Sequence, residues 1–221
     1  MQNFKIYHLL AIIILIVLSI FFLQWLYYNF FPQPYPNREI YSIALIYFIE
    51  ISVTAYVLST KNFTKIHKSL GFNKTSLNFL FIALVFSLIL WLSDYFYQTK
   101  ILLIDLRDEA NQLNNKIIDG ELIISFFSMV IFAPIVEEIL FRGIILKTLC
   151  NYSSKIFAGF IVSLLFALVH LSLLSAVPLF LASSFYVYLT LRTNSIIPAI
   201  SAHILNNCLT FYTYYYLLGY F

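Results

Sequence analysis

The sequence predicts an all-α fold, a polytopic membrane helix bundle of about seven transmembrane helices. Three observations lead to this prediction: the composition, the length of the apolar runs and the placement of the basic residues. The chain of 221 residues is 62% hydrophobic, 19% aromatic and 10% charged, and its mean hydropathy is +0.88. A typical soluble domain is about 25% charged, so the composition excludes a soluble globular protein. The aromatic content fits side chains anchored at the two membrane–water interfaces.

The apolar runs give the individual helices. A spanning helix needs about 20 mostly apolar residues. The first run is longer than the core of a signal peptide, about 7–15 residues, and prolines rather than a small-residue cleavage site follow it. We therefore expect it to be retained, and the sixth run is short for a span. The seven candidate spans are 6–31, 40–59, 77–97, 122–147, 156–174, 177–191 and 196–217.

The basic residues predict the orientation in the membrane. One precedes the first span, four lie between the second and third spans, and the others flank the fourth, fifth and sixth spans. Cytoplasmic loops carry an excess of Lys and Arg, so the N-terminus is predicted to be cytoplasmic and the C-terminus external. No basic cluster is dense enough to indicate a nucleic-acid partner. The basic residues that predict the orientation are Lys5, Lys61, Lys65, Lys68, Lys74, Lys147, Lys155 and Arg192.

Ionisable side chains inside the spans are few. A charged side chain at the centre of a bilayer costs about 3 kcal/mol, so each one needs an explanation. His8 and Asp94 lie near the ends of their spans, and we expect both to be interfacial. Glu50 lies deeper; it either pairs with a neighbouring helix or is protonated, and the sequence leaves both readings open.

The fourth span contains the stretch VEEILFRG, residues 136–143. Glu138 and Arg142 are four residues apart, so they share a helix face and can neutralise each other. Glu137 diverges from Glu138 by about 100° on a helix, which places this arginine poorly for pairing with both carboxylates. Glu137 is therefore protonated, paired with another helix, or kept for chemistry.

Two later spans supply partners at the same spacing. Phe166 and His170 are four residues apart, as are His203 and Asn207. A carboxylate in a dry site has a raised pKa and can take a proton from water. One imidazole would hold that water, while the other imidazole and the amide would donate to the developing oxyanion. His170 lies nearer the end of its span than Glu137 and His203 do, and helix tilt, uneven helix ends or a kink at Pro134 would bring the three together.

A divalent metal is the second option for the same side chains. Glu137, His170 and His203 with a water form a ligand set typical of catalytic zinc. However, the H-E-x-x-H pattern of the common zinc proteases is absent. The sequence therefore requires no cofactor, and zinc or a similar ion stays open.

The three motifs together resemble those of a known family. EEILFRG resembles the E-E-x-x-x-R motif of the CPBP family of intramembrane proteases, which includes type II CAAX prenyl proteases and bacteriocin-processing or bacteriocin-immunity (Abi) proteins. FALVH and HILNN are similar to the family's F-x-x-x-H and H-x-x-x-N motifs, in the same order and on separate spans. The resemblance covers about residues 121–215, the expected protease core. Residues 1–120 would supply further spans and loops of the same membrane domain.

The resemblance implies a role for each motif residue. Glu137 would be the general base and His170 would share the attacking water. His203 and Asn207 would form the oxyanion hole. Glu138, Arg142 and Phe166 would be supporting residues.

The resemblance implies an endopeptidase acting on a membrane-associated peptide or protein tail. The small chain with minimal loops favours a bacterial cell membrane, and with it the processing of, or immunity to, a bacteriocin or pheromone. One alternative is a non-catalytic immunity or scaffold protein that binds a peptide or partner. Another is a proton relay or transporter, although neither internal repeats nor paired broken helices are found.

Overall fold

The described part of the protein is entirely helical. The computed structural model describes residues 66–107, 110–111, 122–170 and 172–218, and the regular elements in these ranges are all helices, as the sequence predicted. The α-helices are α3 (Ile66–Leu70), α4 (Leu77–Phe96), α6 (Leu122–Phe126), α7 (Ala133–Glu138), α8 (Lys147–Leu149), α9 (Lys155–Val169), α10 (Ala176–Thr193) and α11 (Ile197–Tyr212). Four segments have π-helical hydrogen bonding: η2 (Tyr97–Ile101), η3 (Phe127–Phe132), η4 (Ile139–Leu146) and η5 (Thr213–Leu218).

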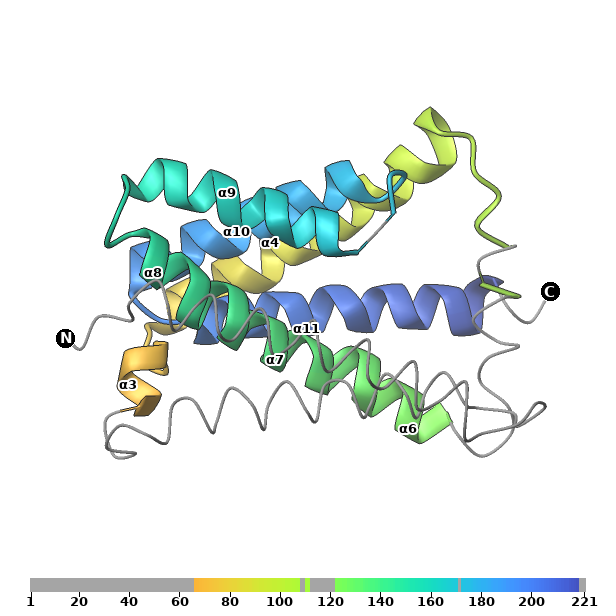
Figure 1. Cartoon of the computed structure of the whole chain (residues 1–221). Coiled ribbons are helices and arrows are strands. Elements are labelled where there is room, and N and C mark those ends of the chain that lie inside the picture. The colour runs from red at the N-terminus through yellow and green to blue at the C-terminus, as the bar shows by residue number, and fades with distance from the viewer. Residues whose placement is uncertain (1–65, 108–109, 112–121, 171, 219–221) are drawn as a thin grey trace, which may run out of the picture.

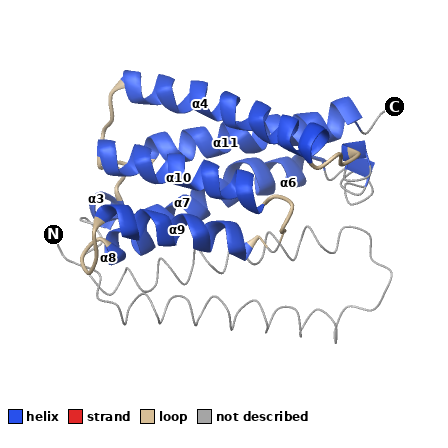
Figure 2. Ribbon diagram, turned by 90° about the horizontal axis from the view of Figure 1, so that it is seen from above, coloured by secondary structure: helices blue, strands red, loops and turns tan. Residues whose placement is uncertain are grey.

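Helix α10 lies at the centre of this bundle (Figures 1 and 2). It packs against α9 on one side and against α4 and α11 on the other, and α11 also contacts α7. Residues 122–149 form one continuous helical rod in which α-helical and π-helical segments alternate. This rod runs past α9, α10 and α11, so it can present side chains to all three.

Five of the seven predicted spans fall within the described residues, and all five are helical. The spans predicted at 77–97, 122–147, 177–191 and 196–217 agree with the observed helices to within a few residues. The span predicted at 156–174 ends earlier, at Val169, where His170 caps the helix. Polar Ser172 and Ser175 follow and pair with each other, which stops the helix before α10 begins. The spans predicted at 6–31 and 40–59, with His8 and Glu50, lie outside the described residues.

Helix α4 has the character of a membrane-spanning helix. Together with η2 it forms Leu77–Ile101, the one helix in the described part of the chain that is long and apolar enough to cross a membrane. Its buried face carries small residues, Ala83 and Ser87, and the Ser87 hydroxyl donates to the carbonyl of Ala202 at 2.6 Å. Small residues and interhelical hydrogen bonds are typical of helix packing in lipid. The total of seven spans stays a prediction.

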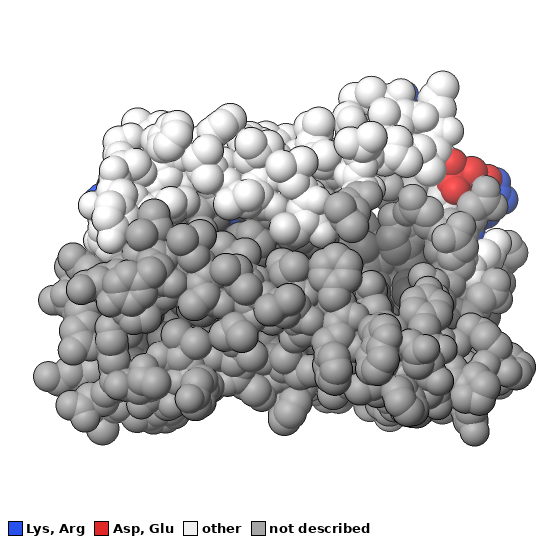
Figure 3. Space-filling model, viewed as in Figure 1, with Lys and Arg blue, Asp and Glu red and all other residues white. Residues whose placement is uncertain are grey.

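The face of the described helices that is seen in Figure 3 carries few charged side chains. In the view of Figure 3 the described atoms over the helices are mostly neither acidic nor basic, and acidic atoms gather at one end. Large apolar side chains such as Phe81, Ile156 and Leu173 are exposed. Such a surface is favourable in lipid and costly in water.

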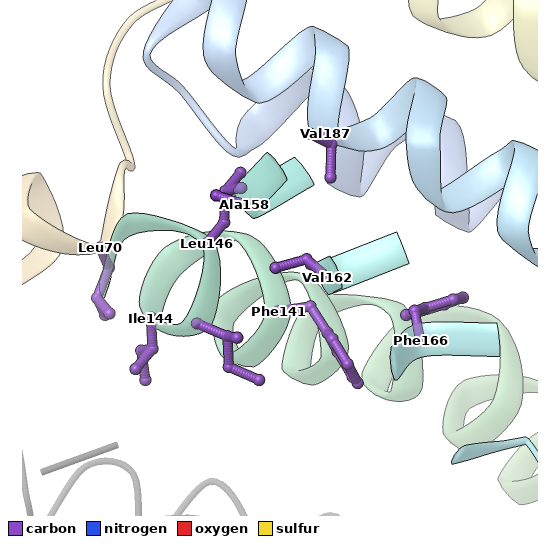
Figure 4. Close-up of a cluster of buried hydrophobic side chains, with 9 residues drawn as sticks. Leu70, Phe141, Ile144, Leu146, Ala158, Val162, Phe166 and Val187 are labelled. Atoms are coloured by element: carbon purple, nitrogen blue, oxygen red, sulfur yellow. The ribbon is translucent and has the colours of Figure 1, made fainter. Parts of the chain in front are cut away.

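A buried apolar cluster joins the start of the described chain to the rod and to α9 and α10 (Figure 4). Its centre is formed by Phe141, Ile144, Val162 and Phe166, which lie between η4 and α9. Leu70 of α3 belongs to the same cluster. The cluster fixes the distance between the helix carrying the glutamates and the helix carrying His170.

The turn after α3 is fixed by a glycine with a positive φ. Gly71 has φ +100°, and its carbonyl accepts a hydrogen bond from the N–H of Ile196 at 2.9 Å. The ammonium group of Lys147 donates to the carbonyl of Ser69 at 2.8 Å. A Cβ at position 71 would lie 2.8 Å from Lys147 Nζ and 3.2 Å from a methyl group of Ile196. The turn thus ties α3 both to the rod and to the start of α11.

We expect Gly71→Ala to destabilise the protein. A non-glycine residue held in this backbone region costs about 1–3 kcal/mol, and 1 kcal/mol lowers the Tm of a protein of this size by about 2–4 °C. Thermal unfolding of the purified full chain in detergent should therefore show a Tm lower by about 2–12 °C. Ser76→Ala is the matched control because Ser76 is exposed and its side chain makes no helix-capping hydrogen bond. An unchanged Tm for Gly71→Ala would show that the turn relaxes without strain.

Candidate active site

The two adjacent glutamates lie at the end of α7, where the rod changes to π-helical hydrogen bonding. Glu138 and Arg142 are fully buried, and Arg142 Nη1 donates to Glu138 Oε1 at 2.8 Å. This confirms the pair predicted from the four-residue spacing. The side chain of Glu137 is 16% exposed, and Arg142 donates hydrogen bonds to Glu138 and Ser183.

Arg142 ties the rod to α10 and to α9. Its Nη2 donates to the hydroxyl of Ser183 at 2.6 Å and to the carbonyl of the same residue at 3.1 Å. The guanidinium carbon lies 4.8 Å from the ring centre of Phe166 and 5.3 Å from that of Tyr186. Hydrogen bonds and cation–π contacts replace the hydration that the buried charge has lost.

His203 of α11 contacts both glutamates. Its Nδ1 lies 3.0 Å from Glu138 Oε1, and its Nε2 lies 3.7 Å from Glu137 Oε2. A carboxylate can only accept, so Nδ1 carries the proton in the bond to Glu138. The distance to Glu137 is longer than a hydrogen bond, for which the usual upper limit is about 3.2 Å. Glu137 thus lies close to α11, and the three alternatives that the sequence left open for it stay open.

His170 lies across Phe166 from this network. The ring centre of Phe166 is 4.8 Å from that of His170 and 5.7 Å from that of His203. His170 Nδ1 lies 2.7 Å from the carbonyl oxygen of Phe166. Because a carbonyl can only accept, Nδ1 carries a proton, and in the neutral ring Nε2 is an acceptor. His170 is exposed at the end of α9, whereas His203 is buried.

Asn207 lies one turn after His203 and contacts the rod before Pro134. Its Nδ2 donates to the carbonyl of Met129 at 2.9 Å. In η3 the N–H of Ala133 donates to the carbonyl of Ser128, five residues back. Pro134 would pair with Met129 in the same register but has no N–H. The amide of Asn207 thus satisfies a carbonyl that Pro134 leaves without a backbone donor, and its second N–H is available to another acceptor.

A family comparison covers the segment that holds all these residues. Residues 119–209 match the family model described as type II CAAX prenyl endopeptidase Rce1-like. This segment is Rce1-like. The match confirms the resemblance to the CPBP proteases that the three motifs indicated. No curated protein and no solved structure matches the chain.

The family that this segment resembles is a membrane-embedded family of peptidases. The membrane location agrees with the apolar surface of the described helices and with the helix Leu77–Ile101. The structure brings Glu137, Glu138 and His203 of the Rce1-like segment into direct proximity, and it places His170 one aromatic ring away. Asn207 lies on the same helix as His203 and is oriented by the rod.

The Rce1-like segment does not assemble a set of three metal ligands in this structure. Among the described residues, no three His, Cys, Asp or Glu side chains form a group that could hold a metal ion. In the set suggested by the sequence, Glu137 lies 3.7 Å from His203, and the ring of Phe166 contacts both His203 and His170. The residues therefore do not fit a three-ligand metal site in this arrangement, and we derive no step through a metal.

Sequence reasoning missed two residues of the site, Ser183 and Tyr186 of α10. Ser183 binds Arg142, and Tyr186 stacks on His203 with ring centres 5.1 Å apart. A serine or a tyrosine in an apolar helix is common, so neither residue carries a signal of its own. Their three-residue spacing, which places them on one face of a helix, is the only local indication.

An apolar cleft lies between the rod and α11. It has a volume of about 250 Å³ and is lined by side chains of α6, η3 and α11, among them Phe126, Cys208 and Phe211. None of the motif residues lines this cleft.

Proposed function

We propose that the protein is an intramembrane endopeptidase in which Glu137 activates a water molecule for attack on a peptide carbonyl. The observation that carries this proposal is the position of His203, whose two ring nitrogens face the two adjacent glutamates. Glu138 pairs with Arg142 and holds Nδ1 of His203, and we assign the proton transfer to Glu137, which Nε2 faces at 3.7 Å. The family match supports peptide hydrolysis as the class of reaction.

The attack on the substrate uses three groups. Glu137 accepts a proton from the water, and Nε2 of His170 accepts a hydrogen bond from the same water. The resulting hydroxide forms a bond to the peptide carbonyl carbon, and the carbonyl oxygen takes the negative charge. In this proposal His203 carries a proton on each ring nitrogen and keeps both throughout the cycle. It donates from Nε2 to this oxyanion, as does the second N–H of Asn207. Water-excluded donors of this kind are worth far more than the same donors in bulk water.

Collapse of the tetrahedral intermediate completes the reaction. The carbonyl forms again, the C–N bond breaks, and Glu137 returns its proton to the leaving amine. The base thus ends the cycle ionised, as it began, and no external reductant or oxidant is needed. The network of Glu138 and Arg142 stays unchanged throughout and holds His203 in place.

The proposed substrate is a membrane-associated peptide or protein tail. The apolar cleft between the rod and α11 would accept an apolar side chain or lipid group of such a substrate. We place the protein in a bacterial cell membrane as a multi-pass protein with a cytoplasmic N-terminus. Its proposed role there is the processing of, or immunity to, a bacteriocin or pheromone.

One observation favours a second candidate, a non-catalytic immunity or scaffold protein. Asn207 uses one N–H to bind the rod at Met129, and Glu138 and Arg142 neutralise each other, so part of the motif serves packing. A binding protein would keep these contacts without hydrolysis. The two candidates differ in whether new peptide ends appear.

Mass spectrometry of membrane-associated peptides separates the two candidates. Cells that produce the wild-type chain are compared with cells that produce Glu137→Ala at the same level, verified by immunoblot. The protease proposal requires truncated peptides that are present with the wild type and absent with the variant. Identical peptide sets, with protection against the bacteriocin retained by Glu137→Ala, would refute proteolysis and support the binding protein.

A further inference from the structure

Tyr186 of α10 is buried against the candidate active site. It is 1% exposed, and its ring is stacked on that of His203, with ring centres 5.1 Å apart and planes inclined by 24°. Phe166 approaches His203 edge-on, at 5.7 Å and 69°. Arg142 lies 5.3 Å from the Tyr186 ring. Tyr186 thus contacts both His203 and the arginine that neutralises Glu138.

The orientation of His203 needs such a contact. The χ2 torsion of histidine has broad energy wells, so the bond from Nδ1 to Glu138 does not by itself fix the plane of the ring. A rotation that lengthens this bond slightly also moves Nε2 relative to Glu137. A flat ring packed against one face of the imidazole resists this rotation, because it would push the two rings into each other.

We propose that Tyr186 is a positioning residue that holds the imidazole of His203 in the plane in which Nδ1 meets Glu138 and Nε2 faces Glu137. This inference rests on the proposed function as far as catalysis is concerned, while the orientation of the ring is a property of the folded protein. Tyr186 acts through His203. The ring of Tyr186 packs on one face of the imidazole, and the ring of Phe166 contacts it at a steep angle. Together the two contacts restrict rotation of the imidazole.

The aromatic ring of Tyr186, rather than its hydroxyl, carries this role. In the part of the chain that the structure describes, the hydroxyl has no hydrogen-bond partner, whereas the ring makes the contact with His203. A phenylalanine would keep the ring contact. Tyr186→Phe is therefore the conservative variant that should retain function, and Tyr186→Leu removes the ring.

NMR of the full chain in detergent tests the position of His203 without relying on activity. The protein has four histidines, so His203→Gln assigns the His203 resonances in a sample with labelled histidine. An aromatic ring stacked on an imidazole shifts its proton resonances upfield. We expect Tyr186→Leu to move the His203 signals toward those of exposed His67, and Tyr186→Phe to leave them in place.

Kinetics on the peptide identified by mass spectrometry test the consequence for hydrolysis. A misplacement of about 1 Å can lower a rate by about 100-fold, so we expect Tyr186→Leu to lower kcat by about 10–100-fold with KM within about two-fold. Tyr186→Phe should keep kcat within about two-fold of the wild type. Tyr188→Leu is the matched control because Tyr188 lies on α10 but is 50% exposed. Should Tyr186→Leu fail to fold, Tyr186→Met removes the ring and fills more of the space.

The outcomes separate this inference from the proposed function. An unshifted His203 resonance, or a wild-type kcat, in the variants without the ring would overturn the role of Tyr186 alone. Equal losses in Tyr186→Phe and Tyr186→Leu would also overturn it, since the hydroxyl and not the ring would then matter. Full hydrolysis by Glu137→Gln would remove the proposed function, and the NMR result would still decide whether Tyr186 positions His203.

Discussion

Glu137→Gln is expected to abolish hydrolysis, with kcat lowered by about 10²–10⁴-fold, the usual contribution of a general base. Glutamine has nearly the shape of glutamate but cannot take a proton from water. It can still face Nε2 of His203, which lies 3.7 Å from Glu137 Oε2 in the native protein. The measurement is the single-turnover rate on the peptide identified by mass spectrometry, with the full chain reconstituted in liposomes.

The loss should be chemical rather than structural. The hydrogen bonds of Arg142 go to Glu138 and Ser183, so the Tm of Glu137→Gln should stay within a few degrees of the wild type. Asp94→Asn is the matched control, because it makes the same change of a carboxylate to an amide. Asp94 lies on α4, where it accepts a hydrogen bond from Gln98 at 2.8 Å, and the control should keep wild-type activity. If Glu137→Gln retained more than a tenth of the rate, Glu137 would not be the base.

The local part of the site could be predicted from the sequence. The helix period alone places Glu138 and Arg142 on one face, and the structure has them 2.8 Å apart. The same period separates Glu137 from this pair, and the structure turns it toward His203. These predictions succeeded because they concern neighbours on one helix, where geometry is nearly independent of the rest of the fold.

The long-range part depended on the motifs rather than on geometry. Glu138 and His203 are 65 positions apart in the sequence, and this spacing does not predict their contact. The prediction that their helices meet came from the order of the three family motifs. The contact of Phe166 with His203 was not predicted, because it depends on how α9 is packed against α11 and the rod. For the same reason the three-ligand metal set looked plausible in the sequence and is not assembled here.

The role of Asn207 shows where local rules stop. Pro134 signalled a disturbed helix, but the carbonyl that it leaves without a donor depends on the register of the preceding turn. In an α-helix that carbonyl would belong to Val130, whereas the π-helical register of η3 makes it Met129. Register changes of this kind arise from packing between helices, so the bond from Asn207 to Met129 could be found only in the structure.

Arg142→Met is expected to cause the largest loss of stability, about 3–5 kcal/mol, the usual cost of removing one partner from a buried ion pair. Arg142 and Glu138 are both fully buried. Without the guanidinium, the carboxylate of Glu138 would keep only His203 as a partner, and Ser183 would lose its donor. The Tm of the full chain in detergent should fall by about 6–20 °C.

A double-mutant cycle distinguishes the pair from simple loss of packing. Glu138→Gln removes the buried negative charge while keeping an oxygen that can accept from His203 Nδ1. If the uncompensated charge causes the loss, Glu138→Gln combined with Arg142→Met should be more stable than Arg142→Met alone. Arg192→Met, an exposed arginine on α10, should change stability by less than about 0.5 kcal/mol. Strictly additive losses in the cycle would show that the two side chains contribute separately to stability. The neutralisation of Glu138 by Arg142, on which the assignment of Glu137 as the base partly depends, would then be refuted.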